Sequence, residues 1–478
     1  MAKIRNGLLS FLFALCAPGW AQPSARSAES VSVKEFGALG NGAADDTAAF
    51  QSALNAAAGK RLYVPAGRYL INSAVALPGN IVVEGEGEES VVVCNSAAGQ
   101  FTATGQSNIT FRSLQFTTAG THTFVPTFTL SDRILIDKVV FRAKLASGQL
   151  GSTTLRTYGS TRLTVQNSRF YDADSFIYLD KSGSTNSDHV IVRNSHFENT
   201  VVGTSNNPTG IYQYNANRLL VDGNLFKNIV AGGNAPISGY GVYAGDGSSL
   251  STEVVNNAAI NTVPGRVFTF VQDAQSTSSV VVNNKFEARA GSGSVFYQGG
   301  ADKGTVRVLR NHSKQGGIFV LGGRTAAAAL KEALIEGNEI VKVEHPAAGI
   351  RIGVGGAYYV GRATVKDNLV VETYAASLYI AECADADVVG NRFINANTAN
   401  GYQGHKESVY LDAVAWDWKG PPGGRFSGNV VANDGARGSK GYARYGLAID
   451  NPANTITESN NVFTGMVAGR TYQVKPSR

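Results

Sequence analysis

The chain has 478 residues, of which 43% are hydrophobic, only 16% are charged and 55 are glycine. This length could hold two or three globular domains, but the glycine-rich, weakly charged composition fits one turn-rich β-structure. The formal net charge of +6 is compatible with a polyanionic ligand, while the scattered basic residues and the lack of a recognition motif argue against nucleic acid.

Residues 1–21 have the pattern of a cleaved secretory signal peptide. Two basic residues precede an apolar run at Leu8–Ala17, and the small residues Gly19 and Ala21 occupy the −3 and −1 positions. The run is too short for a membrane span, which takes about 20 residues, and no later stretch is apolar enough to cross a bilayer. We therefore expect a secreted or periplasmic protein, with a polar linker at residues 22–30.

Residues 31–70 differ from everything that follows, because they contain an amphipathic helix. We expect this helix over Thr47–Ala58, capped by Asp45 or Asp46 and ended by Gly59. Its apolar face is made of Ala49, Phe50, Ala53, Leu54 and Ala57. A helix at the head of a repeat array would cover the open apolar end of the first unit.

From residue 71 to residue 478 a unit of three short strands recurs. In Leu219–Asp246 an apolar strand, an Asp-Gly-Asn turn, a second short strand, a Gly/Pro-rich loop and a third strand follow one another. The apolar residue of the second strand recurs about every 29 residues, the period of a solenoid. Its thirteen positions are Phe116, Phe141, Phe170, Phe197, Phe226, Ala259, Phe286, Ser313, Ile340, Val370, Phe393, Val431 and Phe463.

The units contain no run with helical spacing and no regularly spaced leucines, which leaves a parallel β-helix. We predict an all-β fold: a single-stranded right-handed parallel β-helix of about 12–13 coils, with three strands per coil and an N-terminal capping helix. In most units an Asn lies two residues before the apolar position. We expect it to tolerate the left-handed turn and to bond to the Asn of the next coil. These residues include Asn284, Asn338, Asn368, Asn391, Asn429 and Asn461.

The head segment resembles a known family. VKEFGALGNGAADDTAAFQSAL followed by RLYVPAGRYLI is similar to the N-terminal signature of the pectate-lyase-like β-helix proteins. That group includes rhamnogalacturonase-type enzymes, glycoside hydrolase family 28-related proteins and phage tailspike depolymerases. The resemblance implies the fold and a polysaccharide ligand. Asp45 and Asp46 match structural positions of the signature, so we interpret them as caps rather than catalytic carboxylates.

The third strands predict a stripe of outward side chains. Their apolar positions alternate, and one phase is consistent throughout, with Ile211, Val242, Val267, Val295, Ile318, Ile350, Leu378, Val409 and Leu447 inward. The outward residues are then Tyr178, Tyr212, Tyr243, Phe268, Phe296, Phe319, Arg351, Tyr379, Tyr410 and Ala448. The opposite phase would bury Arg351, which is costly without a partner. Aromatic rings stack on the faces of sugars, so this stripe suits a long glycan.

One interval of the repeat is elaborated. Phe393 and Val431 are 38 residues apart, and insertions flank the strand Ser408–Asp412 on both sides. Such loops often build the wall of a groove, although a solvated basic loop is an equal alternative. The candidate wall residues are Tyr402, His405, Lys406, Trp416, Asp417, Trp418 and Lys419.

Two chemistries are open for such a groove. Hydrolysis needs two carboxylates close together, and Asp412 with Asp450 or Glu382 could supply them. Elimination needs a base and a cation that neutralises a uronic carboxylate. Arg351, flanked by Phe319 and Tyr379 and preceded by Arg324, supplies that combination.

The sequence requires no cofactor. Calcium, which several members of the resembling family use, could sit on Asp246 and Asp273, but no tight carboxylate cluster demands it.

We therefore predict a secreted monomer that binds an acidic polysaccharide and cleaves it by β-elimination. The catalytic candidates are Arg351, Arg324, Tyr379 and Asp412, and the stripe and the elaborated loops bind the substrate. A glycoside hydrolase and a non-catalytic glycan-binding surface protein are the alternatives.

The signal peptide makes one direct prediction. Exported protein should begin at Gln22, and its intact mass should show the loss of residues 1–21. Exported protein that still starts at Met1 would contradict this interpretation.

Overall fold

The computed structural model describes residues 29–474 apart from short segments. The segments outside the description are 96–100, 119–125, 144–152, 201–207, 231–238, 246–248, 264–267, 274–275, 288–294, 298–303, 324–328, 344–347, 355–357, 399–406, 413–422, 434–442, 451–454 and 467. The predicted signal peptide and most of the predicted linker thus lie outside the described residues.

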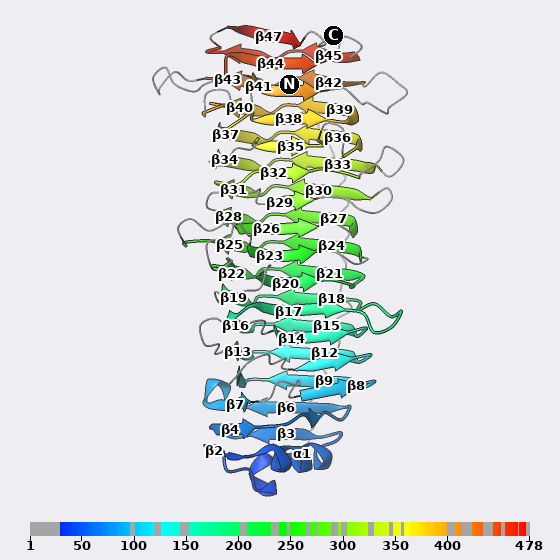
Figure 1. Ribbon diagram of the computed structural model, residues 1–478, viewed down its shortest axis with the longest axis vertical. Helices are drawn as coiled ribbons and strands as arrows, with labels where there is room; N and C mark the ends of the chain where they lie inside the picture. Colours follow the sequence, from blue (N-terminus) through cyan, green and yellow to red (C-terminus); the bar gives the residue numbers. More distant parts are fainter. Residues whose placement is uncertain are drawn as a thin grey trace, which may run out of the picture.

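The chain forms a right-handed parallel β-helix, in which three long sheets run side by side along one axis (Figure 1). Successive strands enter the sheets in turn, and every pairing between neighbouring coils is parallel. We call the sheets A, B and C. The predicted fold class is confirmed.

Sheet A contains β1 (Ser30–Ser32), β3 (Arg61–Val64), β6 (Ile81–Gly85), β9 (Ser107–Arg112), β12 (Asp132–Asp137), β15 (Thr161–Gln166), β18 (Val190–Arg193), β21 (Arg218–Asp222), β24 (Ser249–Val255), β27 (Ser276–Val282), β30 (Thr305–Leu309), β33 (Leu330–Glu336), β36 (Val360–Lys366), β39 (Cys383–Val389), β42 (Gly423–Ser427) and β45 (Thr455–Ser459). Sheet B contains β2 (Asn41–Asp45), β4 (Gly67–Ile71), β7 (Ser90–Cys94), β10 (Gln115–Thr118), β13 (Val140–Arg142), β16 (Arg169–Ala173), β19 (His196–Thr200), β22 (Leu225–Lys227), β25 (Ala258–Ile260), β28 (Lys285–Glu287), β31 (His312–Lys314), β34 (Glu339–Val343), β37 (Leu369–Thr373), β40 (Arg392–Ile394), β43 (Val430–Ala432) and β46 (Val462–Thr464). Sheet C contains β5 (Val75–Ala76), β8 (Phe101–Thr104), β11 (Thr127–Thr129), β14 (Thr153–Tyr158), β17 (Ser175–Asp180), β20 (Thr209–Gln213), β23 (Gly239–Ala244), β26 (Phe268–Asp273), β29 (Val295–Tyr297), β32 (Ile318–Val320), β35 (Ile350–Ile352), β38 (Leu378–Ala381), β41 (Glu407–Asp412), β44 (Tyr445–Asp450) and β47 (Gly469–Val474).

The amphipathic helix α1 (Thr47–Ala56) lies at the N-terminal end of the coils (Figure 1). Its side chains Phe50, Ala53 and Leu54 are fully buried, and the Phe50 ring packs edge-on against Tyr69 at 5.4 Å. Of the two predicted caps, Asp45 is confirmed, because its carboxylate accepts a hydrogen bond from the Thr47 backbone N–H at 3.0 Å. The helix ends at Ala56, two residues before the predicted end. The Asp46 carboxylate makes no bond to the helix and instead accepts hydrogen bonds from the backbone N–H groups of the preceding turn at residues 39 and 40.

The rest of the head segment joins the solenoid. Strands β1 to β4 pair with the first coils of sheets A and B, so the segment at 31–70 is continuous with the β-helix. A short 3-10 helix, η1 (Val33–Phe36), lies in this segment, and a second, η2 (Gly87–Glu89), follows between β6 and β7. Within the described residues no helix is long and apolar enough to span a membrane.

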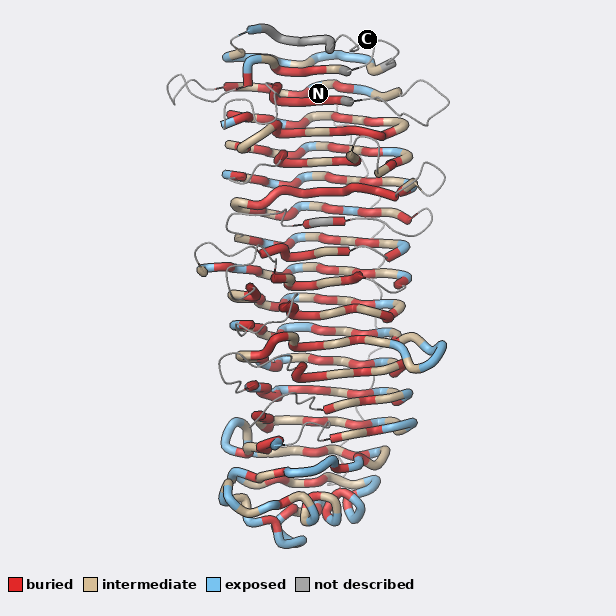
Figure 2. Tube along the Cα trace, viewed as in Figure 1, coloured by how far each residue is buried: buried red, intermediate tan, exposed pale blue. Residues whose placement is uncertain are grey.

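The interior of the coils is a continuous apolar core, with buried and exposed residues alternating along the strands (Figure 2). The thirteen recurring apolar positions are register partners in sheet B, one below another. Four successive phenylalanine rings, Phe141, Phe170, Phe197 and Phe226, stack inside with centroids 4.7 to 4.9 Å apart. The predicted period is therefore confirmed, and three further strands of sheet B, β2, β4 and β7, precede Phe116.

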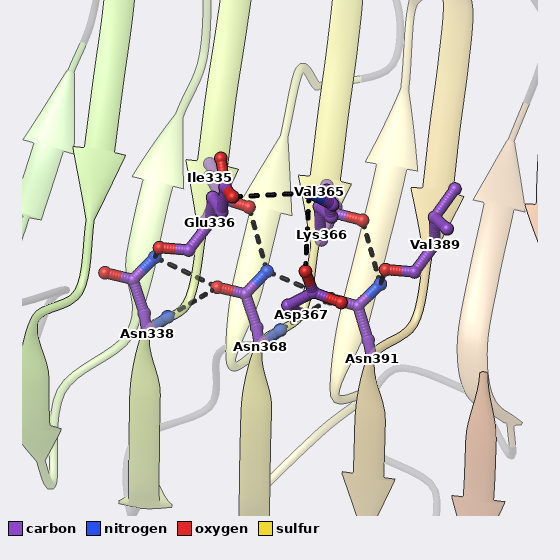
Figure 3. Close-up of polar contacts among 9 residues, drawn as sticks. All are labelled: Ile335, Glu336, Asn338, Val365, Lys366, Asp367, Asn368, Val389 and Asn391. Atoms are coloured by element: carbon purple, nitrogen blue, oxygen red, sulfur yellow. Dashed lines mark hydrogen bonds and ion pairs between the residues drawn. The ribbon is translucent and has the colours of Figure 1, made fainter. Parts of the chain in front are cut away.

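A buried ladder of asparagines closes the turn between sheets A and B (Figure 3). The Asn338 side-chain amide donates to the Asn368 Oδ1 at 2.9 Å and to the Val308 carbonyl at 2.8 Å. Its own Oδ1 accepts from both the backbone N–H and the side-chain amide of Asn311. The same contacts join Asn224, Asn257, Asn284, Asn311, Asn338, Asn368, Asn391, Asn429 and Asn461, and Ser168 and Ser195 extend the ladder toward the N-terminus.

The left-handed backbone of this turn lies one residue earlier than we expected. The residue with positive φ precedes each ladder asparagine, as at Asn256, Asn283 and Gly337. The ladder position itself does not need a positive φ. The residue type there is therefore determined by the hydrogen bonds of the side-chain amide and not by the backbone conformation. The turn thus separates the two tasks that we had assigned to one residue.

The ladder predicts a large loss of stability for Asn338→Leu. Leucine leaves the buried amide of Asn311 without its acceptor and removes the donor to Asn368, which should cost about 3 kcal/mol or more. Asn55→Leu, on the exposed face of α1, is the control and should change little. The two urea midpoints are to be compared, and equal shifts would show that the ladder does not contribute to stability.

Candidate functional site

One column of side chains runs the length of the outer face of sheet C. Pairing in register places one side chain per strand in this column. In chain order the column is Arg156, Tyr178, Tyr212, Tyr243, Gln272, Phe296, Phe319, Arg351, Tyr379, Tyr410 and Ala448. Neighbouring members are about 4.8 Å apart, the spacing of hydrogen-bonded strands.

The column faces away from the core. The residues before its members, such as Ile211, Val242 and Ile350, are fully buried. Tyr178, Tyr212, Tyr243, Arg351 and Tyr379 are partly exposed, whereas Phe319 and Tyr410 keep only 7% of their surface exposed. The expected alternation is therefore present, while the role of these residues in binding stays a prediction.

Phe268 does not belong to this column. It pairs with Gly239, four residues ahead of the column position, and its side chain is 1% exposed in the core. Gln272 occupies the column instead and pairs with Tyr243. Alternation alone cannot separate positions 268 and 272, because both have the same parity along the strand. The aromatic stripe is therefore interrupted by an amide.

Arg351 is the charged member in the C-terminal half of the column. Its guanidinium lies over the ring of Tyr379, 5.2 Å from the centroid, and Tyr379 stacks on Tyr410 at 5.1 Å with 16° between the planes. The Arg351 Nε is buried and has no hydrogen-bond partner among the described residues. A buried donor of this kind costs free energy unless an acceptor satisfies it.

A second cation, Arg156, stands at the other end of the column. Its guanidinium lies between two tyrosine rings, 4.9 Å from the centroid of Tyr158 and 4.5 Å from that of Tyr178. Sequence reasoning missed Arg156, Tyr158, Tyr214 and Tyr240. The strand β14 has no aromatic at the stripe position itself, and Tyr214 follows the end of β20, so the pattern of the stripe did not include them.

Several predicted carboxylates are not placed for catalysis on this face. Asp273 points inward, is 1% exposed and accepts a hydrogen bond from the Ser276 N–H at 2.9 Å. Glu382 is also fully buried. The sequence made Asp273 a candidate calcium ligand and Glu382 a candidate hydrolytic carboxylate of the groove, and the structure corrects this. Asp273 takes the inward parity of its strand, and Glu382 follows the end of β38 with a left-handed backbone.

Asp412 and Asp450 are direct register partners on neighbouring strands, as the sequence predicted. Their backbones are described, but their side chains are not. Asp246, the other predicted calcium ligand, lies outside the described residues. Among the described residues no three His, Cys, Asp or Glu side chains gather in a way that could hold a metal ion.

The other predicted site residues lie outside the described part of the chain. These are Arg324, Tyr402, His405, Lys406, Trp416, Asp417, Trp418 and Lys419. The side chain of Phe296 is also outside the description, although its backbone belongs to β29.

Known proteins resemble the chain in sequence. A family model described as "Rhamnogalacturonase A/epimerase, pectate lyase-like" matches residues 30–287, more than half of the chain. The pre-neck appendage protein of Bacillus phage B103 is 40% identical over 63 residues, which are 13% of this chain and 7% of that protein. Mannuronan C5-epimerase AlgE3 of Azotobacter vinelandii is 41% identical over 71 residues, which are 13% of this chain and 4% of that protein. The chain therefore spans less than a tenth of these relatives.

A solved structure also aligns with most of the chain. The A-module of mannuronan C-5 epimerase AlgE4 from Azotobacter vinelandii covers 94% of this chain, and the match covers 98% of that module. The TM-score is 0.36 and the sequence identity is 15%.

The corrected register predicts opposite outcomes for two neighbouring residues. Phe268→Ala should open a core cavity and lower the free energy of unfolding by about 3–5 kcal/mol. Gln272→Ala should change it by less than about 0.5 kcal/mol, because the side chain lies on the surface. Urea denaturation of both variants checks this. A Phe268→Ala protein as stable as the wild type would contradict the core position of Phe268 and would indicate that it lies on the outer face.

Proposed function

Because the chain belongs to the rhamnogalacturonase A/epimerase, pectate lyase-like family, we propose that it binds an acidic, uronate-containing polysaccharide along sheet C and cleaves it by β-elimination. The observation that carries this proposal is Arg351, a cation in a column that is otherwise aromatic or uncharged over the neighbouring coils. Its buried Nε, which has no hydrogen-bond partner among the described residues, would donate to the carboxylate of one uronate residue.

Elimination begins at the carbon next to the uronate carboxylate. A base removes the proton from that carbon, a double bond forms toward the β carbon, and the glycosidic oxygen on the β carbon leaves and takes up a proton. Negative charge builds up on the carboxylate as the proton departs. A guanidinium already held against that carboxylate stabilises the developing charge without rearranging, which is the largest contribution that a site of this kind can make.

Tyr379 is the group that we propose takes the proton. Its ring lies directly beneath the Arg351 guanidinium, on the next strand of the same face. The ring is held from the other side by Tyr410, so its hydroxyl has a defined position. Phe319 lies on the preceding strand and gives the sugar at Arg351 an apolar neighbour. Arg324 stays a candidate for a second contact to the substrate.

One observation favours hydrolysis as the second candidate. Asp412 and Asp450 are register partners, so their backbones are about 4.8 Å apart. Retaining glycosidases hold two carboxyl groups about 5–5.5 Å apart, which two neighbouring strands can provide. This pair lies one and two strands beyond Tyr379.

The reaction is tested by its products. The protein is incubated with polygalacturonate, alginate and hyaluronate, while ultraviolet absorbance and reducing ends are followed together. We expect both to rise, because elimination leaves an unsaturated sugar at each cut. Reducing ends without absorbance would favour the carboxylate pair, and retained binding with neither signal would make the protein a glycan-binding module.

The Arg351→Gln variant measures how much the Arg351 cation contributes to turnover. Turnover should fall by about 10²–10³, while polymer binding is largely retained, because the lost interaction strengthens only as charge develops. Arg307→Gln, an exposed arginine of sheet A, is the matched control and should leave turnover unchanged. If the Arg351→Gln protein cleaves at the full rate, Arg351 is not catalytic, and Asp412 and Asp450 become the preferred catalytic candidates.

A further inference from the structure

The N-terminal half of sheet C carries a cluster of tyrosines that the proposed reaction does not use. We call this cluster the tyrosine platform; it comprises Tyr158, Tyr178, Tyr212, Tyr214, Tyr240 and Tyr243. All six are partly exposed. The rings touch in sequence: Tyr178 and Tyr212 have centroids 5.1 Å apart, and Tyr212 and Tyr243 have centroids 5.0 Å apart.

Two further contacts widen the platform beyond a single column. Tyr214 lies 5.9 Å from Tyr212 and 6.4 Å from Tyr178, nearly parallel to the latter. Tyr240 lies 4.9 Å from Tyr243, with its ring tilted by 51°. The platform is therefore wider than a single row of rings, and it offers faces and edges to a ligand at once.

The platform is suited to binding rather than to proton transfer. Burial, with a smaller effect from the Asp180 carboxylate, raises the pKa of Tyr178 to about 12. Burial also raises the pKa of Tyr158. Both hydroxyls therefore stay protonated and can donate hydrogen bonds at any physiological pH, which excludes them as bases.

The distance between the two halves follows from the register. Arg351 is four strands from Tyr243 and six strands from Tyr178. At the strand spacing this is about 19 Å and about 29 Å respectively. An extended sugar chain advances by nearly one residue per strand, so a chain lying along the column would need about four residues to reach the platform from Arg351.

We propose that the tyrosine platform is a remote anchoring subsite for the same acidic polysaccharide chain, which makes the protein act on long chains in preference to short ones. This rests on the proposed function, because it takes Arg351 as the point of cleavage. Sugar rings stack on the tyrosine faces, and the hydroxyls donate to the hydroxyl groups of the sugar. The guanidinium of Arg156, stacked at the far end, meets a carboxylate of the chain.

A glycan fits this surface better than other ligands for two reasons. The platform has the strand repeat along its length, which suits a polymer of equivalent rings rather than a single small molecule. It is also continuous, through one column, with Arg351. Asp180 lies beside the platform, but its carboxylate already accepts hydrogen bonds from the Lys181 N–H and from the Asn215 amide, at 2.7 and 2.9 Å.

The test compares substrates of two lengths. The double variant Tyr178→Ala/Tyr212→Ala is assayed with the uronan that the wild type cleaves, as polymer and as tetrasaccharide. A tetrasaccharide bound across Arg351 is too short to cover the platform. We expect kcat/KM for the polymer to fall at least about fivefold, through KM, and that for the tetrasaccharide to stay unchanged. Tyr171→Ala on sheet B is the control aromatic and should affect neither substrate.

The outcomes are distinct. Equal losses on both substrates, or no loss on the polymer, would overturn the proposal. If the Ala variant does not fold, Tyr178→Phe/Tyr212→Phe keeps the rings and should retain most polymer binding in affinity electrophoresis. If the wild type cleaves no uronan, the same electrophoresis still tests the platform. Loss of polymer binding in the Ala variant would then support the tyrosine platform as a binding site and contradict the proposed lyase activity. Retained binding would overturn the proposal for the platform.

Discussion

The hydrogen-bonded stacking of each strand on its equivalent in the next coil is the constraint on which the rest of this structure depends. Parallel pairing in register forces residues at one phase of the repeat into a column, about 4.8 Å apart. The environment of a side chain therefore depends on the side chains at the same position in the coils above and below it. Inside the coils this gives the phenylalanine stack of sheet B, and outside it gives the column of sheet C.

The asparagine ladder protects this register where the chain turns from sheet A to sheet B. Each ladder amide is hydrogen-bonded to the asparagine of the next coil and to a backbone carbonyl. A shift of the strand register by one residue would break these bonds, so the ladder opposes such a shift. A one-residue slip would turn the apolar positions outward and would break the column on sheet C. The ladder is therefore a condition for the geometry at Arg351, although it lies on another edge of the coil.

Much of the fold could be predicted from the sequence because a repeat presents the same signal many times. The period, the inward phenylalanines and helix α1 needed only local patterns, and single degenerate units such as those at Ala259 and Ser313 did not hide them. The outer face was harder. Phe268 and Gln272 have the same parity, so only the pairing of β23 with β26 could distinguish them.

The site residues whose positions could not be predicted from the sequence have one physical feature in common. Asp273 and Glu382 follow column residues closely in sequence, but one points inward and the other lies past the end of its strand. Tyr214 and Tyr240 reach the platform from positions beside the column, and Arg156 precedes the first aromatic of the stripe. Such lateral neighbours depend on where each strand begins and ends, which composition and alternation do not determine.

The central claim is that one acidic glycan lies along sheet C, with a carboxylate at Arg351 and rings on the tyrosine platform. The most direct measurement is a crystal structure of the Tyr379→Phe variant with a uronan dodecasaccharide, since this variant retains Arg351 but lacks the proposed base. The account predicts a sugar carboxylate within hydrogen-bonding distance of the Arg351 guanidinium and sugar rings over Tyr178, Tyr212 and Tyr243. An oligosaccharide bound on sheet A or sheet B, away from Arg351, would contradict it.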